Sequence, residues 1–266
     1  MKNLEDKTAL ITSATKGIGL ACAIKLAENG AEVYLAVRRV KATEEICSKY
    51  KGIGYKMKPV YFDAAKTETY KTMVEETAAQ AGGIDILVNN FGMGKPAEDL
   101  DLVNGSEEAF FDILNLNLGS VYRITKLVVP YMLKRQGGSI VNISSIGGLI
   151  PDVTRIGYGV SKAAINNITQ QIAIQFARSN IRCNAVLPGL TAIDAAMDNM
   201  PKEFLESFLS HVPLNRMATP EDIANAVMFF AGKESAYITG HILDVAGGYG
   251  IATPQYGEIM RAKKQP

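Results

Sequence analysis

Three side chains near the middle of the chain have the types needed to remove a proton from an alcohol. Tyr158 and Lys162 are four residues apart, so on a helix they share one face. Ser145 lies thirteen residues before Tyr158, at the end of the apolar stretch SIVNIS. A tyrosine has an ordinary pKa of about 10, and a nearby ammonium lowers it. The pattern therefore indicates a base, a cation that activates it, and a hydroxyl that bonds to a substrate oxygen.

The charge of one lysine is large enough for this activation. An ammonium about 4–5 Å from the phenolate, at an effective dielectric constant of about 20, stabilises the phenolate by about 3–4 kcal/mol, or about 2–3 pKa units. The spacing alone is weak evidence, because Tyr122 and Lys126 repeat it. Thirteen residues before Tyr122 stands Ala109, which carries no hydroxyl. We therefore interpret Tyr122 and Lys126 as helix surface or interface.

Short apolar segments rich in valine and isoleucine alternate with amphipathic segments along the chain. The predicted strands cover residues 8–12, 31–37, 58–62, 84–89, 139–144, 181–187 and 241–245. The predicted helices cover residues 17–28, 40–50, 66–80, 106–135 as two helices, 157–179 and 220–231. This alternation predicts an α/β fold with a doubly wound, mostly parallel seven-stranded sheet and helices on both faces, in a single domain over residues 1–266.

Two segments depart from this alternation. Residues 190–216 contain two prolines and carry apolar side chains at roughly helical spacing. We expect them to form a lid over a substrate, and the alternative is a helical pair that only packs on the core. The chain also continues as a tail at residues 250–266, which is long enough to close over a bulky ligand.

A glycine turn follows the first predicted strand, in the stretch TSATKGIG at residues 12–19. Glycine lets the backbone approach a pyrophosphate closely, and the start of the next helix offers N–H groups to an anion. The predicted cofactor contacts in this turn are Ser13, Thr15, Lys16, Gly17, Ile18 and Gly19.

Two arginines, Arg38 and Arg39, stand at the end of the second predicted strand, in EVYLAVRRV. In a dinucleotide fold this position meets the adenosine ribose, where an acid suits the 2′-hydroxyl of NAD and a basic residue suits the 2′-phosphate of NADP. Lys16 adds a third positive charge to the same region. The pair therefore predicts NADP, with Arg38 as the direct phosphate contact, and the alternative is a solvated surface pair.

These motifs resemble the short-chain dehydrogenase/reductase family over nearly the whole chain. The family turn T-G-x-x-x-G-x-G has Ser13 at its first glycine, a residue that fits badly if φ must be positive. The family stretch N-N-A-G is present as NNFG, with Phe91 in place of alanine. The resemblance implies a Rossmann-like fold and the interconversion of a secondary alcohol and a ketone with a nicotinamide cofactor.

The resemblance also implies roles for single residues. The implied catalytic residues are Ser145, Tyr158, Lys162 and Asn117, and Asn117 is expected to hold a water that relays protons to Lys162. The implied further cofactor contacts are Asp63 at the adenine, Asn90 at the ribose, Gly189 and Thr191 at the nicotinamide carboxamide, and Tyr158 and Lys162 themselves. Ala246 stands where the family often has aspartate, and we assign it no role.

The substrate is suggested by resemblance alone. The stretches IPDVTRIGYGVSK, HVPLNR and VAGGYGIATPQY are most similar to the bacterial members of the family that oxidise the 7α-hydroxyl of bile acids with NADP. The alternative within the same reaction class is a 3-oxoacyl-carrier-protein reductase, which would need a basic docking patch such as Arg123, Lys126, Lys134 and Arg135. A non-catalytic dinucleotide-binding protein is the alternative of a different class.

The bulk composition narrows the range of partners. The net charge is +1, so we expect no general attraction to nucleic acid or to membranes. Three cysteines without paired spacing and only two histidines predict neither a disulfide framework nor a metal site, which fits the cytoplasm. The N-terminus shows no secretory signal. A homo-oligomer, specifically a homotetramer, is implied by the family resemblance.

Overall fold

The computed structural model describes residues 3–193 and 200–263. Parts of two predicted segments lie outside the described residues: positions 194–199 of the expected lid and positions 264–266 of the expected tail. Everything below concerns the described residues.

Seven strands form one sheet, as predicted. They are β1 (Thr8–Thr12), β2 (Glu32–Val37), β3 (Lys56–Tyr61), β4 (Ile86–Asn89), β5 (Gly138–Ile143), β6 (Ile181–Pro188) and β7 (Ile242–Val245). Their order is β3-β2-β1-β4-β5-β6-β7, and every pairing in it is parallel. The central strands are buried along almost their whole length, which explains their continuous apolar sequences.

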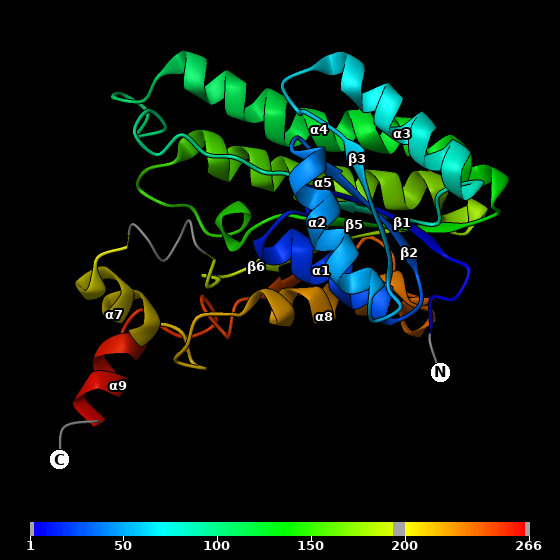
Figure 1. The fold of residues 1–266 in the computed structure, drawn as a ribbon. Helices are drawn as coiled ribbons and strands as arrows, with labels where there is room; N and C mark the ends of the chain where they lie inside the picture. Colours follow the sequence, from blue (N-terminus) through cyan, green and yellow to red (C-terminus); the bar gives the residue numbers. More distant parts are fainter. Residues whose placement is uncertain (1–2, 194–199, 264–266) are drawn as a thin grey trace.

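Helices cover both faces of the sheet (Figure 1). One face carries α3 (Thr67–Ala81), α4 (Glu107–Lys134) and α5 (Ile156–Phe176), and the other carries α1 (Gly17–Glu28), α2 (Val40–Lys51) and α8 (Pro220–Ala231). The expectation of two helices at residues 106–135 was wrong, because α4 is continuous through Pro130. Val128, Val129 and Met132 are buried on either side of that proline. Their packing outweighs the backbone hydrogen bond that proline removes.

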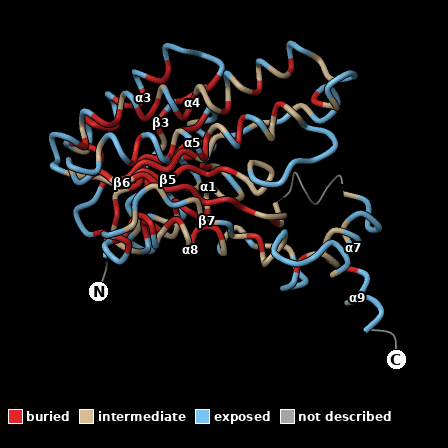
Figure 2. Tube along the Cα trace, turned by 180° about the vertical axis from the view of Figure 1, so that it is seen from behind, coloured by how far each residue is buried: buried red, intermediate tan, exposed pale blue. Residues whose placement is uncertain are grey.

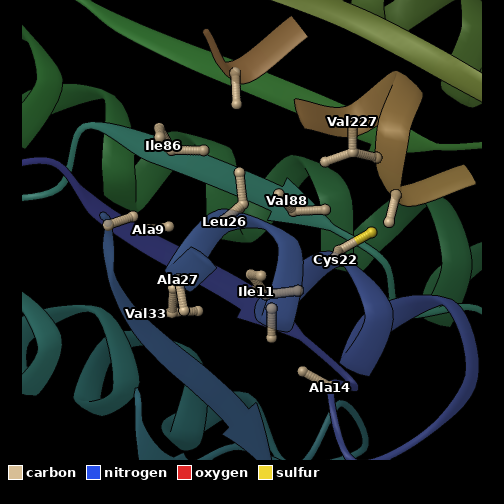
Figure 3. Close-up of a cluster of buried hydrophobic side chains, with 14 of the residues drawn as sticks. Ala9, Ile11, Ala14, Cys22, Leu26, Ala27, Val33, Ile86, Val88 and Val227 are labelled. Atoms are coloured by element: carbon tan, nitrogen blue, oxygen red, sulfur yellow. The ribbon is translucent and has the colours of Figure 1, made fainter. Parts of the chain in front are cut away.

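The hydrophobic core lies on both faces of the sheet, and Figure 2 shows the buried residues concentrated along the central strands. Figure 3 shows the part between the sheet and α1, where Ile11 and Val88 meet Cys22 and Leu26. Val227 of α8 closes the same cluster. Each large side chain buried in this way contributes roughly 1.5–3 kcal/mol. This packing fixes α1, and with it the glycine turn that precedes it.

The three cysteines are free and buried. Burial raises the pKa of the Cys22 thiol to about 12 and that of Cys47 to about 11, so both stay protonated near neutrality. Among the described residues, no cluster of histidine, cysteine and acidic side chains is suited to a metal ion. Within the same residues, no helix combines the length and the apolar character needed to cross a bilayer.

Two short helices stand apart from the sheet, at the lower left of Figure 1. They are α7 (Lys202–Ser210), within the segment expected as a lid, and α9 (Tyr256–Lys263), within the tail. The two pack together: Arg261 Nη1 donates to Ser210 Oγ at 3.1 Å. The ring of Phe208 on α7 also stacks on Tyr249, just before the tail, with 4.7 Å between ring centres. The described parts of the two segments, α7 and α9, thus form one unit.

Candidate active site

The predicted site residues gather along one edge of the sheet. Because the seven strands are parallel, their carboxyl ends share that edge, and the strand order reverses between β1 and β4. Ser13 follows β1, Arg38 follows β2, Asn90 follows β4, Ser145 lies two residues past β5, and Gly189 follows β6. Ligands of open α/β sheets bind at such a reversal. The topology therefore assembles one site from segments that are far apart in the sequence.

The turn after β1 has a left-handed backbone at two positions. Ser13 and Gly17 both have φ +55°, a conformation that suits glycine and costs other residues about 1–2 kcal/mol. Ser13 therefore holds the positive φ at which serine was expected to fit badly. Its N–H donates to the carbonyl oxygen of Ala36 at 2.9 Å, which ties the turn to β2. A Cβ at Gly19 would overlap the carbonyl oxygen of Ser13, so glycine is required there.

The start of α1 fits a dinucleotide pyrophosphate. The helix begins at Gly17, its N-terminal cap residue Lys16 makes no side-chain capping bond, and its first turn contains no acidic residue. The N–H groups of a helix start carry partial positive charge and suit a phosphate. The predicted phosphate cradle thus has both the backbone shape and the electrostatics that it needs.

Asn90 supports this turn from the neighbouring strand. Its Nδ2 donates to the carbonyl oxygens of Thr12 and Ser13 at 3.1 and 3.2 Å. Thr12 Oγ1 in turn accepts from the backbone N–H groups of Asn90 and Phe91, both at 2.9 Å. Sequence reasoning did not single out Thr12, which is fully buried here. The ribose contact expected of Asn90 stays a prediction, since its amide protons bind the turn.

Arg38 and Arg39 are both exposed, directly after β2. The N–H of Ser13 bonds to Ala36, which is two residues before Arg38 in the chain. The glycine turn therefore lies beside the end of β2. Arg39 also precedes α2, where its carbonyl oxygen accepts from Thr43 Oγ1 at 2.8 Å. Within residues 3–193 and 200–263, neither guanidinium pairs with a carboxylate. Both are therefore available to an anion bound beside the turn.

The remaining predicted cofactor contacts lie at the ends of β3 and β6. Asp63 Oδ1 accepts from Ala65 N at 3.1 Å, in a local turn after β3. Thr191 is buried, and its Oγ1 donates to the carbonyl oxygen of Gly189 at 3.0 Å. A Cβ at Gly189 would lie 2.8 Å from the Cα of Ala246. Ala246, to which we assigned no role, is thus the neighbour that requires glycine at position 189.

Tyr158 and Lys162 lie on one face of α5, with Lys162 Nζ 5.6 Å from the centre of the Tyr158 ring. Lys162 is 3% exposed and donates from Nζ to the carbonyl oxygen of Ile143 at 3.0 Å. Ser145 precedes the short 3-10 helix η1 (Ile146–Gly148), and its Oγ accepts from Gly147 N at 3.1 Å. The structure thus brings together the three residues that the sequence selected for chemistry.

The surroundings of Tyr158 favour its ionised form. Burial by itself raises the pKa of the Tyr158 phenol, but the charge of Lys162, a hydrogen bond with Ser145 and the guanidinium of Arg155 outweigh it. The pKa of Tyr158 therefore falls below its ordinary value of 10.0. Burial also lowers the pKa of Lys162, and the neighbouring Tyr158 opposes that effect. A phenol with a lowered pKa is suited to general base catalysis.

Asn117 is fully buried and connects two parts of the site. Its Oδ1 accepts from Met93 N at 2.8 Å, and its Nδ2 donates to Met93 O at 2.9 Å and to Ser161 Oγ at 3.0 Å. Ser161 Oγ donates to the carbonyl oxygen of Tyr158 at 2.7 Å. Asn117 therefore holds the loop after β4 against the first turn of α5. The water relay to Lys162 stays a prediction.

A buried carboxylate that sequence reasoning missed holds the start of α5. Asp99 is 2% exposed, and its two oxygens accept from Gly157 N at 2.7 Å and Tyr158 N at 2.9 Å. Its carbonyl oxygen also accepts from Arg155 N at 2.8 Å. This is the usual action of a helix N-cap, here supplied from the loop after β4. No local sequence pattern predicts this cap, because 58 residues separate Asp99 from Gly157.

The chain is similar over its whole length to known oxidoreductases. The family described as enoyl-(acyl carrier protein) reductase matches residues 13–250. The chain is 63% identical to a 7α-hydroxysteroid dehydrogenase of Paraclostridium sordellii, over 99% of each chain. It is 54% identical to a 7α-hydroxysteroid dehydrogenase of Clostridium sardiniense, over 97% of this chain and 98% of that one. A solved 7α-hydroxysteroid dehydrogenase complexed with NADH and 7-oxo glycochenodeoxycholic acid superposes with a TM-score of 0.88, at 30% identity, over 93% of this chain and 95% of that one.

Proposed function

Because the chain belongs to the short-chain dehydrogenase/reductase family, we propose that it is an NADP-dependent 7α-hydroxysteroid dehydrogenase. In this role it interconverts the 7α-hydroxyl of a bile acid, or of a related steroid, and the corresponding ketone. The observation that carries the proposal is Tyr158, set beside the buried ammonium of Lys162 and the hydroxyl of Ser145, which follows β5. The position and face of the hydroxyl follow from the names of the two relatives.

The residues around Tyr158 supply the acid–base chemistry. NADP, when bound, accepts a hydride from the carbinol carbon, and NADPH donates one in the reverse direction. In oxidation the Tyr158 phenolate takes the proton of the substrate hydroxyl, and in reduction the phenol returns it. The Lys162 ammonium stabilises the phenolate, and the Ser145 hydroxyl donates a hydrogen bond to the substrate oxygen.

The choice of NADP is supported by charge at the end of β2. Arg38 and Arg39 are exposed beside the glycine turn, and the stretch that follows β2 holds no acid to accept from a ribose 2′-hydroxyl. A planar guanidinium binds phosphate oxygens in a forked geometry. The solved relative was complexed with NADH, so the fold itself does not decide between the two cofactors. The proposal for NADP therefore rests on these two side chains.

The steroid is proposed to lie between the catalytic edge and the unit formed by α7 and the tail. The apolar side chains of this unit include Phe204, Phe208 and Tyr249, whose rings form a continuous series of contacts. Ile150, in the loop after η1, lies against Gly250 at the start of the tail. An apolar surface of this kind suits a rigid hydrocarbon ring system. The closing of this unit over a substrate is part of the proposal.

A 3-oxoacyl-carrier-protein reductase is the alternative, and it would need the basic residues of α4 for docking. The structure uses those residues locally: Arg123 donates to Asn115 Oδ1 at 2.6 Å and Arg135 donates to Ala81 O at 3.3 Å. Lys126 and Lys134 lie over the rings of Tyr122 and Tyr131. Turnover of a bile acid and of an acetoacetyl thioester separates the two functions. Brisk thioester reduction without bile-acid turnover would overturn the leading proposal.

We further propose a cytoplasmic homotetramer. Three free, buried cysteines suit a reducing compartment. Large apolar side chains are exposed along α4 and α5, and these are Phe111, Tyr122, Leu133, Val160 and Ile174. Apolar surface of this extent is typical of a subunit interface. Native mass spectrometry is expected to show four copies, and a spectrum containing only the monomer would contradict the assembly.

A further inference from the structure

The ring of Tyr158 has a second cationic neighbour. The guanidinium carbon of Arg155 lies 4.3 Å from the ring centre, closer than the 5.6 Å of Lys162 Nζ. Lys162 is buried, whereas Arg155 is exposed. The phenol is thus in contact with one cation sheltered from water and one that faces solvent. A guanidinium stacked on an aromatic ring at this distance is attracted to it and restrains it.

The backbone of Arg155 explains why the guanidinium lies there. Arg155 stands directly before α5 with φ +63° and ψ +39°, a left-handed conformation that costs a non-glycine residue about 1–2 kcal/mol. Hydrogen bonds to Asp99 offset this cost. Its carbonyl oxygen accepts from Arg155 N, and its carboxylate accepts from Gly157 N and Tyr158 N. Buried hydrogen bonds therefore fix the point from which the Arg155 side chain starts. From this point the guanidinium reaches the face of the Tyr158 ring.

We propose that Arg155 is a positioning residue for Tyr158, whose stacked guanidinium restrains the phenol ring and, together with Lys162, favours the phenolate. The inference rests on the proposed function, since it concerns the base of the same reaction. Lys162 and Tyr158 are shared with that function, whereas Arg155 belongs to neither the cofactor site nor the predicted catalytic set.

The charges around the phenol give the sign of the effect. Lys162 faces it from α5, Arg155 from the turn before α5, and the Ser145 hydroxyl from the segment after β5. The loop after β4 contributes the carboxylate of Asp99, which is bound to the backbone N–H of Tyr158. Both cations lower the pKa of the phenol, and removal of either one raises it. Because Arg155 is exposed, salt screens its contribution to the lowered pKa of Tyr158 much more than it screens the contribution of Lys162.

A titration of Tyr158 tests the inference without any turnover. Tyrosine carrying ¹³C at Cζ is incorporated into the wild-type chain and into the Arg155→Leu and Arg155→Lys variants, and its NMR signals are followed with pH. The signal that is missing in Tyr158→Phe identifies the resonance of Tyr158. We expect Arg155→Leu to raise the titration midpoint of Tyr158 by about 0.5–1 pH unit, since solvent reduces the 1–3 units of a close buried pair. Arg155→Lys is expected to restore most of the shift. Higher salt is expected to raise the wild-type midpoint and to leave Arg155→Leu nearly unchanged.

Lys126→Leu is the matched control, because it removes a cation 5.9 Å from the ring of the exposed Tyr122. It is expected to leave the Tyr158 midpoint where it is. An unchanged midpoint in Arg155→Leu would overturn the inference, and so would an equal shift in Lys126→Leu. If the wild type oxidised no bile acid while Arg155→Leu still raised the midpoint, the proposed function would fail and this inference would stand.

The pH profile of oxidation separates positioning of the base from binding of the substrate. Oxidation needs the phenolate, so a raised pKa moves the acidic limb of kcat/KM to higher pH in Arg155→Leu. The KM for a bile acid at alkaline pH is expected to stay within about twofold of wild type. A KM that rises for the anionic bile acid but not for its methyl ester, with an unmoved limb, would make Arg155 a substrate anchor and would refute the proposal.

Discussion

The ammonium of Lys162 lies 5.6 Å from the centre of the Tyr158 ring, one turn along α5. Nearly the same relationship occurs on α4, where Lys126 lies 5.9 Å from the ring of Tyr122. The two pairs differ in their surroundings. Lys162 is buried, with 3% of its surface exposed, whereas Lys126 and Tyr122 are both exposed. Water screens the charge of an exposed pair, so the buried ammonium of Lys162 acts on its tyrosine ring with less screening than the ammonium of Lys126 does.

Tyr158→Phe removes the proposed base and keeps the shape of the ring. We expect kcat for alcohol oxidation to fall by about 10²–10⁴-fold, the usual contribution of a general base. Tyr122→Phe makes the same chemical change in the exposed pair and is expected to keep wild-type kcat. Steady-state kinetics of the two variants, with circular dichroism to confirm folding, makes the comparison. Intact oxidation by Tyr158→Phe would contradict the role of Tyr158 as the base, whereas a wild type that binds the dinucleotide and oxidises no alcohol would favour the non-catalytic alternative.

Arg38→Ala tests the choice of cofactor. Loss of a charge-assisted contact to the 2′-phosphate is expected to raise the KM for NADP by about 10–100-fold, with little effect on the KM for NAD. Arg39→Ala is expected to act in the same direction and less strongly. Arg178→Ala, at an exposed site after α5, serves as the control for a lost surface charge. Equal small effects on the KM for NADP and the KM for NAD would show that Arg38 and Arg39 are solvated surface residues that do not select the cofactor.

Ser13→Gly is expected to stabilise the fold. Glycine relieves the left-handed strain at φ +55°, and its greater freedom in the unfolded chain offsets part of the gain. The free energy of unfolding should rise by about 0.5–1 kcal/mol, which corresponds to about 1–4 °C in Tm. Ser13→Ala keeps the strain and is expected to show no gain in Tm. Calorimetry that finds Ser13→Gly no more stable than Ser13→Ala would show that the serine is not strained.

Asp99→Asn tests the cap on α5. One of its two acceptors for Gly157 N and Tyr158 N is lost, so the unfolding free energy is expected to fall by about 1–2 kcal/mol. Because the cap positions Tyr158, kcat is expected to fall several-fold. Asp101→Asn is the matched control, since the Asp101 carboxylate accepts within its own turn, from Val103 N and from the backbone and side-chain amides of Asn104. A loss of stability with full kcat would limit Asp99 to a structural role.

Features set by short-range patterns could be predicted from the sequence. The strand, glycine turn and helix from Thr8 to Glu28 depend on neighbouring residues, and their order along the chain predicts the parallel sheet. Tyr158 and Lys162 could be paired because helical spacing places residues four apart on one face. Ser145 could be added because the carboxyl ends of parallel strands meet at one edge.

Features set by contacts across the fold could not be predicted. Asp99 reaches the start of α5 from 58 residues away, and Asn90 supports Ser13 from 77 residues away. The continuity of α4 through Pro130 depends on side chains packed against the sheet, which local propensity does not record. Arg155 stacks on the Tyr158 ring from a left-handed backbone position, and nothing in the stretch IPDVTRIGYGVSK indicates that conformation.

Oxidation of a matched pair of epimers tests whether the enzyme acts on the 7α-hydroxyl with NADP. The wild-type enzyme is given a bile acid with a 7α-hydroxyl and its 7β epimer, each with NADP and with NAD, and the product is identified by mass spectrometry and NMR. We expect the 7α epimer with NADP to give a kcat/KM at least about tenfold above every other combination, which is about 1.4 kcal/mol in the transition state, and to yield the 7-ketone. Equal turnover of the two epimers, a preference for NAD, or a product oxidised at another carbon would contradict it.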